Sequence, residues 1–213
     1  PDHPDAQEYT KRLYGPGHGD DFQLAQESVL GIGGTKILDE LGYEVDTYHM
    51  NEGHAALLTL ELLKQNDLDP EAVREQFVFT THTPFEAGHD EFSWEMVNKV
   101  LGEFVPEETL REYSHEENLN MSLLALNLSR YANSVAKKHQ EVSRNMFPGY
   151  DIDAITNGIH VPFWIGEDYI DLYDEYLEGW QENPYKLKHA MVIPDEELWE
   201  THMDQKRETI EFV

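Results

Sequence analysis

The 213-residue sequence is long enough for one ordinary domain, and its 39% hydrophobic and 27% charged residues are typical of a globular protein. It has no cysteine, which excludes disulfides, thiol nucleophiles and cysteine-based zinc sites. Lys and Arg total 15 against 43 Asp and Glu, and the formal net charge of −28 would repel nucleic acids and anionic membranes. No apolar run approaches the roughly 20 residues that span a bilayer. We therefore expect a cytoplasmic protein with neither a nucleic-acid nor a membrane partner.

The acidic residues are spread over the whole chain and are not gathered in a tail. Two interpretations remain open. One is an ordinary acidic enzyme, and the other is adaptation to a high-salt cytoplasm, where salt screens the repulsion between like charges. A refolding titration separates them, because only the second predicts stability that rises with added KCl.

The predicted elements of the N-terminal part begin with a loop, because the first 20 residues are polar and rich in Gly and Pro. From Phe22 to Leu41 the spacing of apolar residues predicts helical turns that are interrupted at Gly31–Gly34. Gly42 is expected to end this helix. A strand is predicted over 43–50, followed by a helix from about residue 52 to residue 65.

The second predicted strand, Gln76–Thr81, is short, apolar and β-branched, as buried strands are. Helices are predicted near 93–104, near 107–114 and, most strongly, over 119–139. A third strand is predicted at Tyr150–Thr156, after a Pro-Gly pair. Strands that alternate with helices of this length predict an α/β fold built on a parallel sheet.

Three strands make a thin sheet, because a parallel sheet needs cover on both faces and both edges. We therefore expect part of a larger domain, a partial Rossmann-like sheet flanked by helices. From about Pro162 the sequence is aromatic and helical. Its last helix is expected to open at Asp195, whose charge suits the positive end of the helix dipole.

Polar side chains follow each predicted strand, at the end where parallel α/β sheets bind their ligands. All three segments are rich in His, Asn and carboxylates, whereas a pure scaffold needs only turn residues. They are His49-Met50-Asn51-Glu52-Gly53-His54, Thr81-His82-Thr83-Pro84-Phe85-Glu86-Ala87-Gly88-His89-Asp90 and Thr156-Asn157-Gly158-Ile159-His160-Val161-Pro162-Phe163-Trp164. Such side chains form directional hydrogen bonds, so the joint pattern predicts a small polar ligand such as a sugar.

Taken singly, each of these residues has a plainer explanation. His54 can cap its helix, Asn157 and Gly158 form a common turn pair, and Trp164 suits a core. A metal site is a further alternative, with ligands drawn from the histidines and Glu52. The chain has no HExxH spacing, and residues 49 and 54 lie five apart across a strand–helix junction, so we expect no metal.

The same segments resemble the glycogen/α-glucan phosphorylase family, and more closely its short prokaryotic branch. The match covers about residues 22–165, in the family's order and spacing. Its segments are Leu24-Ala25-Gln26-Glu27, Leu30-Gly31-Ile32-Gly33-Gly34, His49 to Ala56, Phe79 to Pro84, Asn120-Met121-Ser122, Asn133-x-Val135-Ala136-x-x-His139, and Thr156 to His160 with Trp164.

The resemblance implies the N-terminal lobe of a two-lobed GT-B glycosyltransferase and reversible phosphorolysis of α-1,4-glucans to glucose 1-phosphate. Residues 1–165 would form an incomplete Rossmann-like lobe, and residues 166–213 a helical lead-out toward a missing second lobe. α-Glucan and inorganic phosphate are the implied ligands. The missing lobe or a complementary chain is the implied protein partner.

By matched position, His82 is similar to the histidine that binds the glucose 6-hydroxyl and whose backbone carbonyl faces the reacting centre. Asn157 matches an asparagine that hydrogen-bonds the same sugar, so these two are the implied catalytic residues. Thr83 follows as a neighbouring contact. Glu52 and His54 match residues that line the channel near the anomeric side, although the mammalian branch has an aspartate at position 52.

The family uses pyridoxal 5′-phosphate, whose phosphate assists proton transfer to and from substrate phosphate. Trp164 matches a tryptophan beside this cofactor, so the resemblance implies contact only. It assigns no lysine of this sequence to the covalent Schiff base and no basic residue to either phosphate. The isolated chain is therefore expected to be inactive.

Two other functions compete with a phosphorylase segment. A non-catalytic glucan-binding or scaffolding module would use the same lobe without chemistry. A sugar-nucleotide-dependent glucan synthase shares the two-lobed fold, but it predicts a Lys-x-Gly-Gly loop near the N-terminus, which this sequence does not show.

Overall fold

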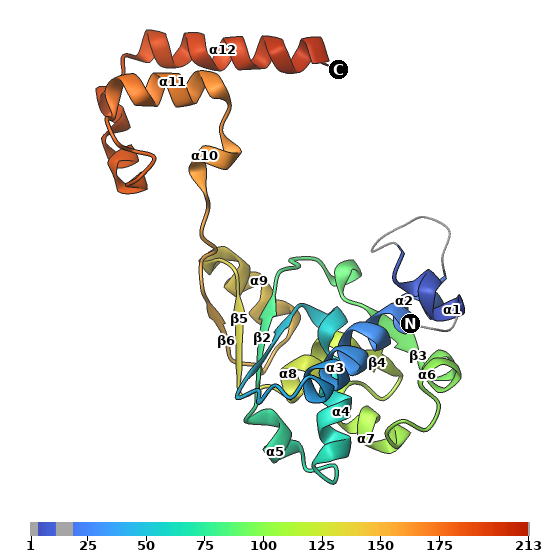
Figure 1. Ribbon diagram of the computed structural model, residues 1–213. Coiled ribbons are helices and arrows are strands. Elements are labelled where there is room, and N and C mark those ends of the chain that lie inside the picture. Colours follow the sequence, from blue (N-terminus) through green and yellow to red (C-terminus); the bar gives the residue numbers. More distant parts are fainter. Residues whose placement is uncertain (1–3, 12–18, 213) are drawn as a thin grey trace. The chain divides into compact units, whose positions relative to one another are not determined.

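The computed structural model describes residues 4–11 and 19–212 of the chain (Figure 1). Contacts within the chain divide it into two compact units, residues 1–157 and residues 158–213. The boundary expected after residue 165 lies inside the second unit and stays a prediction. Within the described ranges, no helix combines the length and the apolar character that crossing a membrane requires.

The first unit alternates helices and strands along the chain. Its described elements are α1 (Pro4–Tyr9), α2 (Asp20–Ser28), a π-turn (Val29–Gly33), α3 (Gly34–Glu40), β1 (Tyr48–Asn51), a 3-10 turn (Gly53–Ala55), α4 (Leu58–Gln65), α5 (Pro70–Arg74), β2 (Phe77–Thr81), a 3-10 turn (Glu86–Gly88), β3 (Glu91–Ser93), α6 (Trp94–Leu101), α7 (Glu107–Tyr113), β4 (Asn118–Asn120), α8 (Met121–Asn127), β5 (Tyr131–Ser134), α9 (Lys137–Met146) and β6 (Ile152–Ala154).

Four parallel strands of the described residues form the central sheet, in the order β1-β2-β5-β6. This arrangement confirms the predicted α/β fold with a parallel sheet. Met50, Phe79 and Ala132 are paired across three strands and belong to one buried core. That core also contains the apolar sides of α4 and α8. In Figure 1, α9 lies along β5 and β6, in agreement with its contacts.

The opposite face of the sheet is more polar. On this face Asn51 of β1 pairs with Thr80 of β2, which pairs with Asn133 of β5. Asn51 is exposed. Strand side chains alternate between faces, so the residues next to the buried apolar ones point to this polar side. The alternation within β1 and β2 therefore separates a core face from a face that carries hydrogen-bonding groups.

The predicted interruption at Gly31–Gly34 is wrong in detail, because the backbone continues through a π-turn into α3. Gly31 lies where a side chain would collide with the start of α4. A Cβ there would come within 2.5 Å of the Leu58 nitrogen. The glycine run therefore permits close helix packing and does not end the helix. Gly42 does end it, as predicted, with φ of +75°.

The predicted helix over 119–139 is also wrong. The structure divides this segment into β4, α8, β5 and α9. β5 is only four residues long and its last three residues are buried between β2 and β6. Its apolar residues continue the helical spacing of α8, and only pairing with neighbouring strands distinguishes a short buried strand from helix.

Three smaller differences concern element ends. The loop predicted for the first 20 residues contains α1, and its Gly/Pro-rich part at 14–18 falls outside the described residues. The strand predicted over 43–50 is shorter, because β1 begins at Tyr48. The helix predicted from residue 52 begins with a 3-10 turn before α4. Boundaries depend on capping and local geometry, which apolar spacing does not encode.

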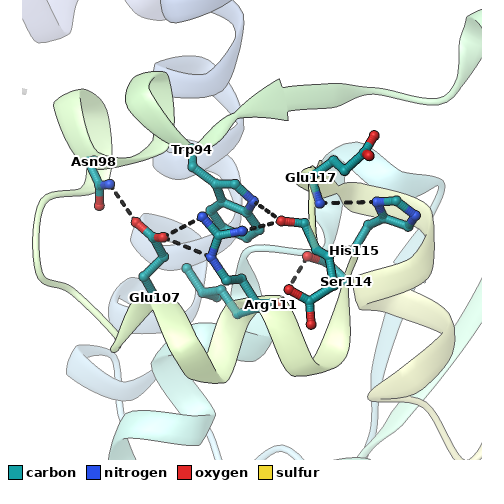
Figure 2. Close-up of polar contacts among 9 residues, drawn as sticks. Trp94, Asn98, Glu107, Arg111, Ser114, His115 and Glu117 are labelled. Atoms are coloured by element: carbon teal, nitrogen blue, oxygen red, sulfur yellow. Dashed lines mark hydrogen bonds and ion pairs between the residues drawn. The ribbon is translucent and has the colours of Figure 1, made fainter.

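A polar cluster fastens α6, α7 and the segment before β4 together (Figure 2). The Arg111 guanidinium lies 4.5 Å from the centre of the Trp94 ring and donates to the Glu107 carboxylate at 2.6 Å. The Trp94 indole nitrogen and Arg111 both donate to the carbonyl of Glu116. Hydrogen bonds from Asn98 and Arg111 lower the pKa of Glu107. These contacts hold α6, α7 and the segment before β4 together.

The second unit is helical, as predicted for the C-terminal tail. Its described elements are α10 (Val161–Trp164), α11 (Glu167–Tyr176), a 3-10 segment (Pro184–Val192) and α12 (Asp195–Phe212). Trp180 is fully buried and its indole nitrogen donates to Asp174 at 2.8 Å. The Tyr176 hydroxyl donates to the Glu197 carboxylate at 2.8 Å and joins α11 to α12.

Candidate functional site

The carboxyl ends of the parallel strands bring the predicted loops to one edge of the sheet. Glu52 follows β1 and His82 follows β2, and these two strands are direct neighbours. Asn157 lies three residues after the end of β6, which is separated from β2 by β5. Two strand spacings correspond to about 10 Å. The topology therefore places the first two loops side by side, with the third further along the same edge.

Glu52 connects the first two loops. Its side chain is buried, with 7% of its surface exposed. Oε2 accepts hydrogen bonds from the backbone nitrogens of His82 at 2.7 Å and Thr83 at 3.0 Å, and Oε1 accepts one from the Gly53 nitrogen at 3.2 Å. Three backbone N–H groups therefore surround this carboxylate, an arrangement that compensates for its burial.

The backbone of Glu52 is strained. Its φ of 70° and ψ of 170° lie in a region that residues other than glycine almost never occupy. Such conformations persist where the surroundings over-determine them. Here the hydrogen bonds to the side chain, together with the pairing of β1, provide that constraint.

His89 holds the same loop from its other side. One ring nitrogen, Nε2, lies 3.1 Å from the Thr83 carbonyl oxygen, and Nδ1 lies 2.8 Å from the Ser122 hydroxyl. A carbonyl only accepts, so Nε2 carries a hydrogen and donates to Thr83, while Nδ1 and the Ser122 hydroxyl share the second hydrogen bond. The ring packs edge-on against Phe147. Both nitrogens are thus engaged by the protein itself.

The His82 side chain is exposed although its backbone is held. Thr83 is half-buried and lies close to Gly88, where an added Cβ would meet its Cγ2 at 2.5 Å. The loop from His82 to His89 therefore presents the exposed His82 imidazole on a constrained backbone. Sequence reasoning predicted His82 and Thr83 but gave His89 no part in holding them.

Asn157 is fixed differently. Its backbone nitrogen donates to the Val135 carbonyl at 3.1 Å, while its side chain is exposed. Gly158, the next residue, has no atom within 4 Å of where a Cβ would lie.

The two remaining predicted site residues are His54 and Trp164. His54 is half-buried in the 3-10 turn after Glu52. Trp164 belongs to the second unit, where it is 70% exposed and contacts Phe163 edge-on at 5.2 Å.

A polar row crosses the sheet near its carboxyl end. The Thr80 hydroxyl donates to the Asn133 side-chain oxygen at 2.9 Å, so His49 Nε2, at 2.7 Å, is the donor to Thr80. His49, considered above as a metal ligand, is therefore engaged within the sheet. Among the described residues, no three His, Asp or Glu side chains gather as a metal ion would require.

Glu27 is a buried carboxyl that the sequence reasoning did not single out. Burial, and then repulsion from Asp90, raises its pKa to about 8. The Gln23 amide donates to both carboxyl groups, at 3.0 Å to Glu27 and 2.7 Å to Asp90. The signal in the sequence is its position, because it shares a helix face with the buried Leu24 and Gly31.

Comparison with known proteins identifies relatives of the chain, although no protein-family model matches it. It is 35% identical to the maltodextrin phosphorylase of Thermococcus litoralis over 217 residues, which cover 91% of this chain. It is also 35% identical to the glycogen phosphorylase of Aquifex aeolicus over 97% of the chain, and 32% identical to that of Mycobacterium tuberculosis over 79%. The chain is homologous to the glycogen and maltodextrin phosphorylases.

This phosphorylase homologue spans 26%, 33% and 23% of the lengths of these three relatives. The chain therefore aligns with only part of each of these full-length phosphorylases. Its exposed groups are an imidazole and an amide, which can donate and accept hydrogen bonds to a polyhydroxylated ligand.

Proposed function

We propose that this chain is part of an α-1,4-glucan phosphorylase and contributes the loops that bind one glucose unit. The observation that carries the proposal is the exposed His82 ring on a backbone held by Glu52 and His89. A sugar-binding group gains affinity when its position is fixed before binding. The names of the homologues supply the substrate class, glycogen or maltodextrin.

Each predicted site residue has a role in this proposal. The His82 ring would bind a sugar hydroxyl, and the Asn157 amide would hydrogen-bond the same sugar from the third loop. Thr83 would be a neighbouring contact. His54 and Glu52 would lie near the anomeric side, where the glucan and the attacking phosphate meet.

Pyridoxal 5′-phosphate is the cofactor proposed for the complete enzyme, where it would supply a phosphate group that assists proton transfer. Trp164 fits a contact with it, because its indole is largely exposed and a flat aromatic surface packs well on another ring. The described cations include Arg74, Arg111 and Arg144, which are paired with acidic side chains of the chain itself. The resemblance places no basic residue of this sequence at either phosphate, so we assign phosphate binding to the second lobe or a complementary chain.

The proposal is tested with a chimera in which this sequence replaces the aligned segment of the Thermococcus litoralis enzyme. We expect the chimera to release glucose 1-phosphate from maltodextrin and phosphate, and His82→Ala to reduce the rate at least about a hundredfold. Glu40→Gln, an exposed helix position, is the matched control and should leave the rate unchanged. A folded, cofactor-loaded chimera without activity would contradict the proposal. Phosphorolysis by the isolated 213-residue chain would contradict its expected incompetence.

A glucan-binding module without catalysis is the second candidate. It is favoured by one observation, the exposed His82 and Asn157 side chains, which can hydrogen-bond a polyhydroxylated ligand without any reaction. Calorimetry of the isolated chain with maltooligosaccharides separates the two. Heat of binding that His82→Ala and Asn157→Ala abolish would favour a module that works alone, and absence of heat would argue against it.

A further inference from the structure

The peptide group between His82 and Thr83 has a fixed direction. Its N–H, which belongs to Thr83, donates to Glu52 Oε2 at 3.0 Å. The described residues contain no cis peptide bond, and a planar trans peptide has its C=O opposite to its N–H. The carbonyl of His82 therefore points away from the Glu52 carboxylate.

Two further hydrogen bonds prevent this peptide group from rotating. The His82 N–H donates to the same carboxylate oxygen at 2.7 Å, and the Thr83 carbonyl accepts from His89 at 3.1 Å. Rotation of the peptide plane would break the bond to Glu52 and disturb its neighbours. A hydrogen bond from an N–H to a carboxylate also polarises the peptide, and this increases the negative charge on the His82 carbonyl oxygen.

Glu52, which holds the loop after β2, is itself fixed by the packing of its neighbour Gly53. Gly53 packs so closely on α8 that an added Cβ would lie 3.0 Å from the Ser122 hydroxyl. Ser122 in turn hydrogen-bonds His89, which binds Thr83. Hydrogen bonds and packing thus form a closed circuit from Glu52 through the β2 loop to α8 and back. This circuit accounts for the persistence of the strained backbone at Glu52.

We propose that Glu52 is a positioning residue that directs the His82 carbonyl oxygen toward the bound sugar. This inference rests on the proposed function, because the oxygen acts by stabilising positive charge that develops at the reacting carbon. It assigns Glu52 a different role from a direct sugar contact. Both of its carboxylate oxygens already accept backbone hydrogen bonds, and the side chain is buried.

The first test uses the full 213-residue chain and needs no sugar. Backbone amide exchange is measured by NMR in the wild type and in Glu52→Leu, which removes both acceptor oxygens. We expect the amides of His82 and Thr83 to exchange at least about tenfold faster, while that of Phe79 in β2 is unchanged. Unchanged exchange at Thr83 would overturn the proposal, as would an equal acceleration at Phe79, which indicates general destabilisation.

Glu52→Gln is the second variant, and it tests the role of Glu52 if Glu52→Leu does not fold. Its side-chain oxygen can still accept from His82 and Thr83, but the charge is gone. We expect slow exchange at both amides, with an upfield shift of the Thr83 amide proton because the bond is weaker. A Thr83 proton with its wild-type shift would overturn the role of the carboxylate charge. Glu52→Gly relieves the backbone strain and should behave like Glu52→Leu at Thr83.

The catalytic consequence is tested in the chimera described above. We expect Glu52→Leu to lower kcat at least about tenfold with KM little changed, because the carbonyl acts on charge in the transition state. An unchanged kcat would overturn the positioning role. The two proposals fail in different ways: an inactive chimera contradicts the phosphorylase function, whereas unchanged amide exchange contradicts the role of Glu52.

Discussion

The loops after β2 and after β6 lie at the same edge of the sheet and are fixed by different means. The β2 loop, residues 82–90, is held by the distant side chain of Glu52 and by its own His89, which also contacts Ser122 of α8. The β6 loop, residues 155–157, is held by backbone hydrogen bonds to β5 and the residue after it. Side-chain hydrogen bonds therefore fix the first loop, whereas the second loop continues the backbone pairing of the sheet.

The two loops differ in how much ordering of the binding side chain a ligand would require. The His82 ring starts from a backbone whose peptide groups are already directed, so little ordering is required when a ligand arrives. The Asn157 amide is exposed, and only its backbone is anchored. We therefore expect substitutions around the β2 loop to change stability and substitutions in the β6 loop to change ligand binding without affecting the fold.

The largest expected effect concerns pH and the far end of the β2 loop, where Asp90 lies close to Glu27. Burial and the Asp90 charge raise the pKa of Glu27 to about 8, so the folded state retains a proton that the unfolded state releases above its usual pKa of 4.5. Stability therefore falls as pH rises from about 4.5 to about 8, by about 1.4 kcal/mol per pH unit for this group. Glu27→Gln should remove this slope.

Urea unfolding of both proteins at several pH values between 5 and 8 measures the Glu27 effect. Glu27→Gln is expected to be the more stable protein at pH 8. Glu40→Gln, at an exposed helix position, serves as the control and should retain the wild-type slope. A wild-type slope in Glu27→Gln would show that another group causes the pH dependence.

The second prediction compares two glycines. Gly31→Ala places a Cβ against backbone atoms at the start of α4, which follows the turn that carries Glu52. Backbone cannot move aside easily, so we expect a loss of about 3 kcal/mol in the free energy of unfolding. Gly158→Ala, beside the β6 loop, meets no atom within 4 Å and should change stability little. Thermal unfolding of both variants checks this, and equal losses would contradict the packing argument.

The third prediction removes the other holder of the β2 loop. His89→Leu leaves the Thr83 carbonyl and the Ser122 hydroxyl without their partner, at a cost of about 1–3 kcal/mol. Urea unfolding measures this loss. His89→Gln keeps a donor near the Nε2 position and should recover part of the stability. If His89→Leu is as stable as the wild type, the two hydrogen bonds do not stabilise the loop.

The smallest expected effect on stability is that of Asn157→Ala. The amide of Asn157 is exposed and the backbone bond to Val135 is retained, so the change should stay within about 0.5 kcal/mol. The same urea measurement checks it. A loss similar to that of His89→Leu would erase the contrast between the two loops.

Apolar spacing and loop composition predicted much of the architecture. The buried β2, the stop at Gly42 and the helical tail are local features, and local patterns reveal them. The spacing failed at β5, because the four residues Tyr131–Ser134 become a strand only through pairing with β2 and β6. It failed at Gly31 because the glycine permits close contact with the start of α4, which lies 27 residues further along the chain.

The sequence by itself determined the α/β fold class, the polar character of the strand-end loops and the relationship to the phosphorylases. Tertiary structure decided which of these polar residues hold the site and which remain available. Glu52 and His89 look like ligand-binding residues in the sequence, yet their side chains are buried against backbone groups. A hydrogen bond between residues 30 positions apart depends on the neighbouring order of β1 and β2, and no local pattern encodes that order.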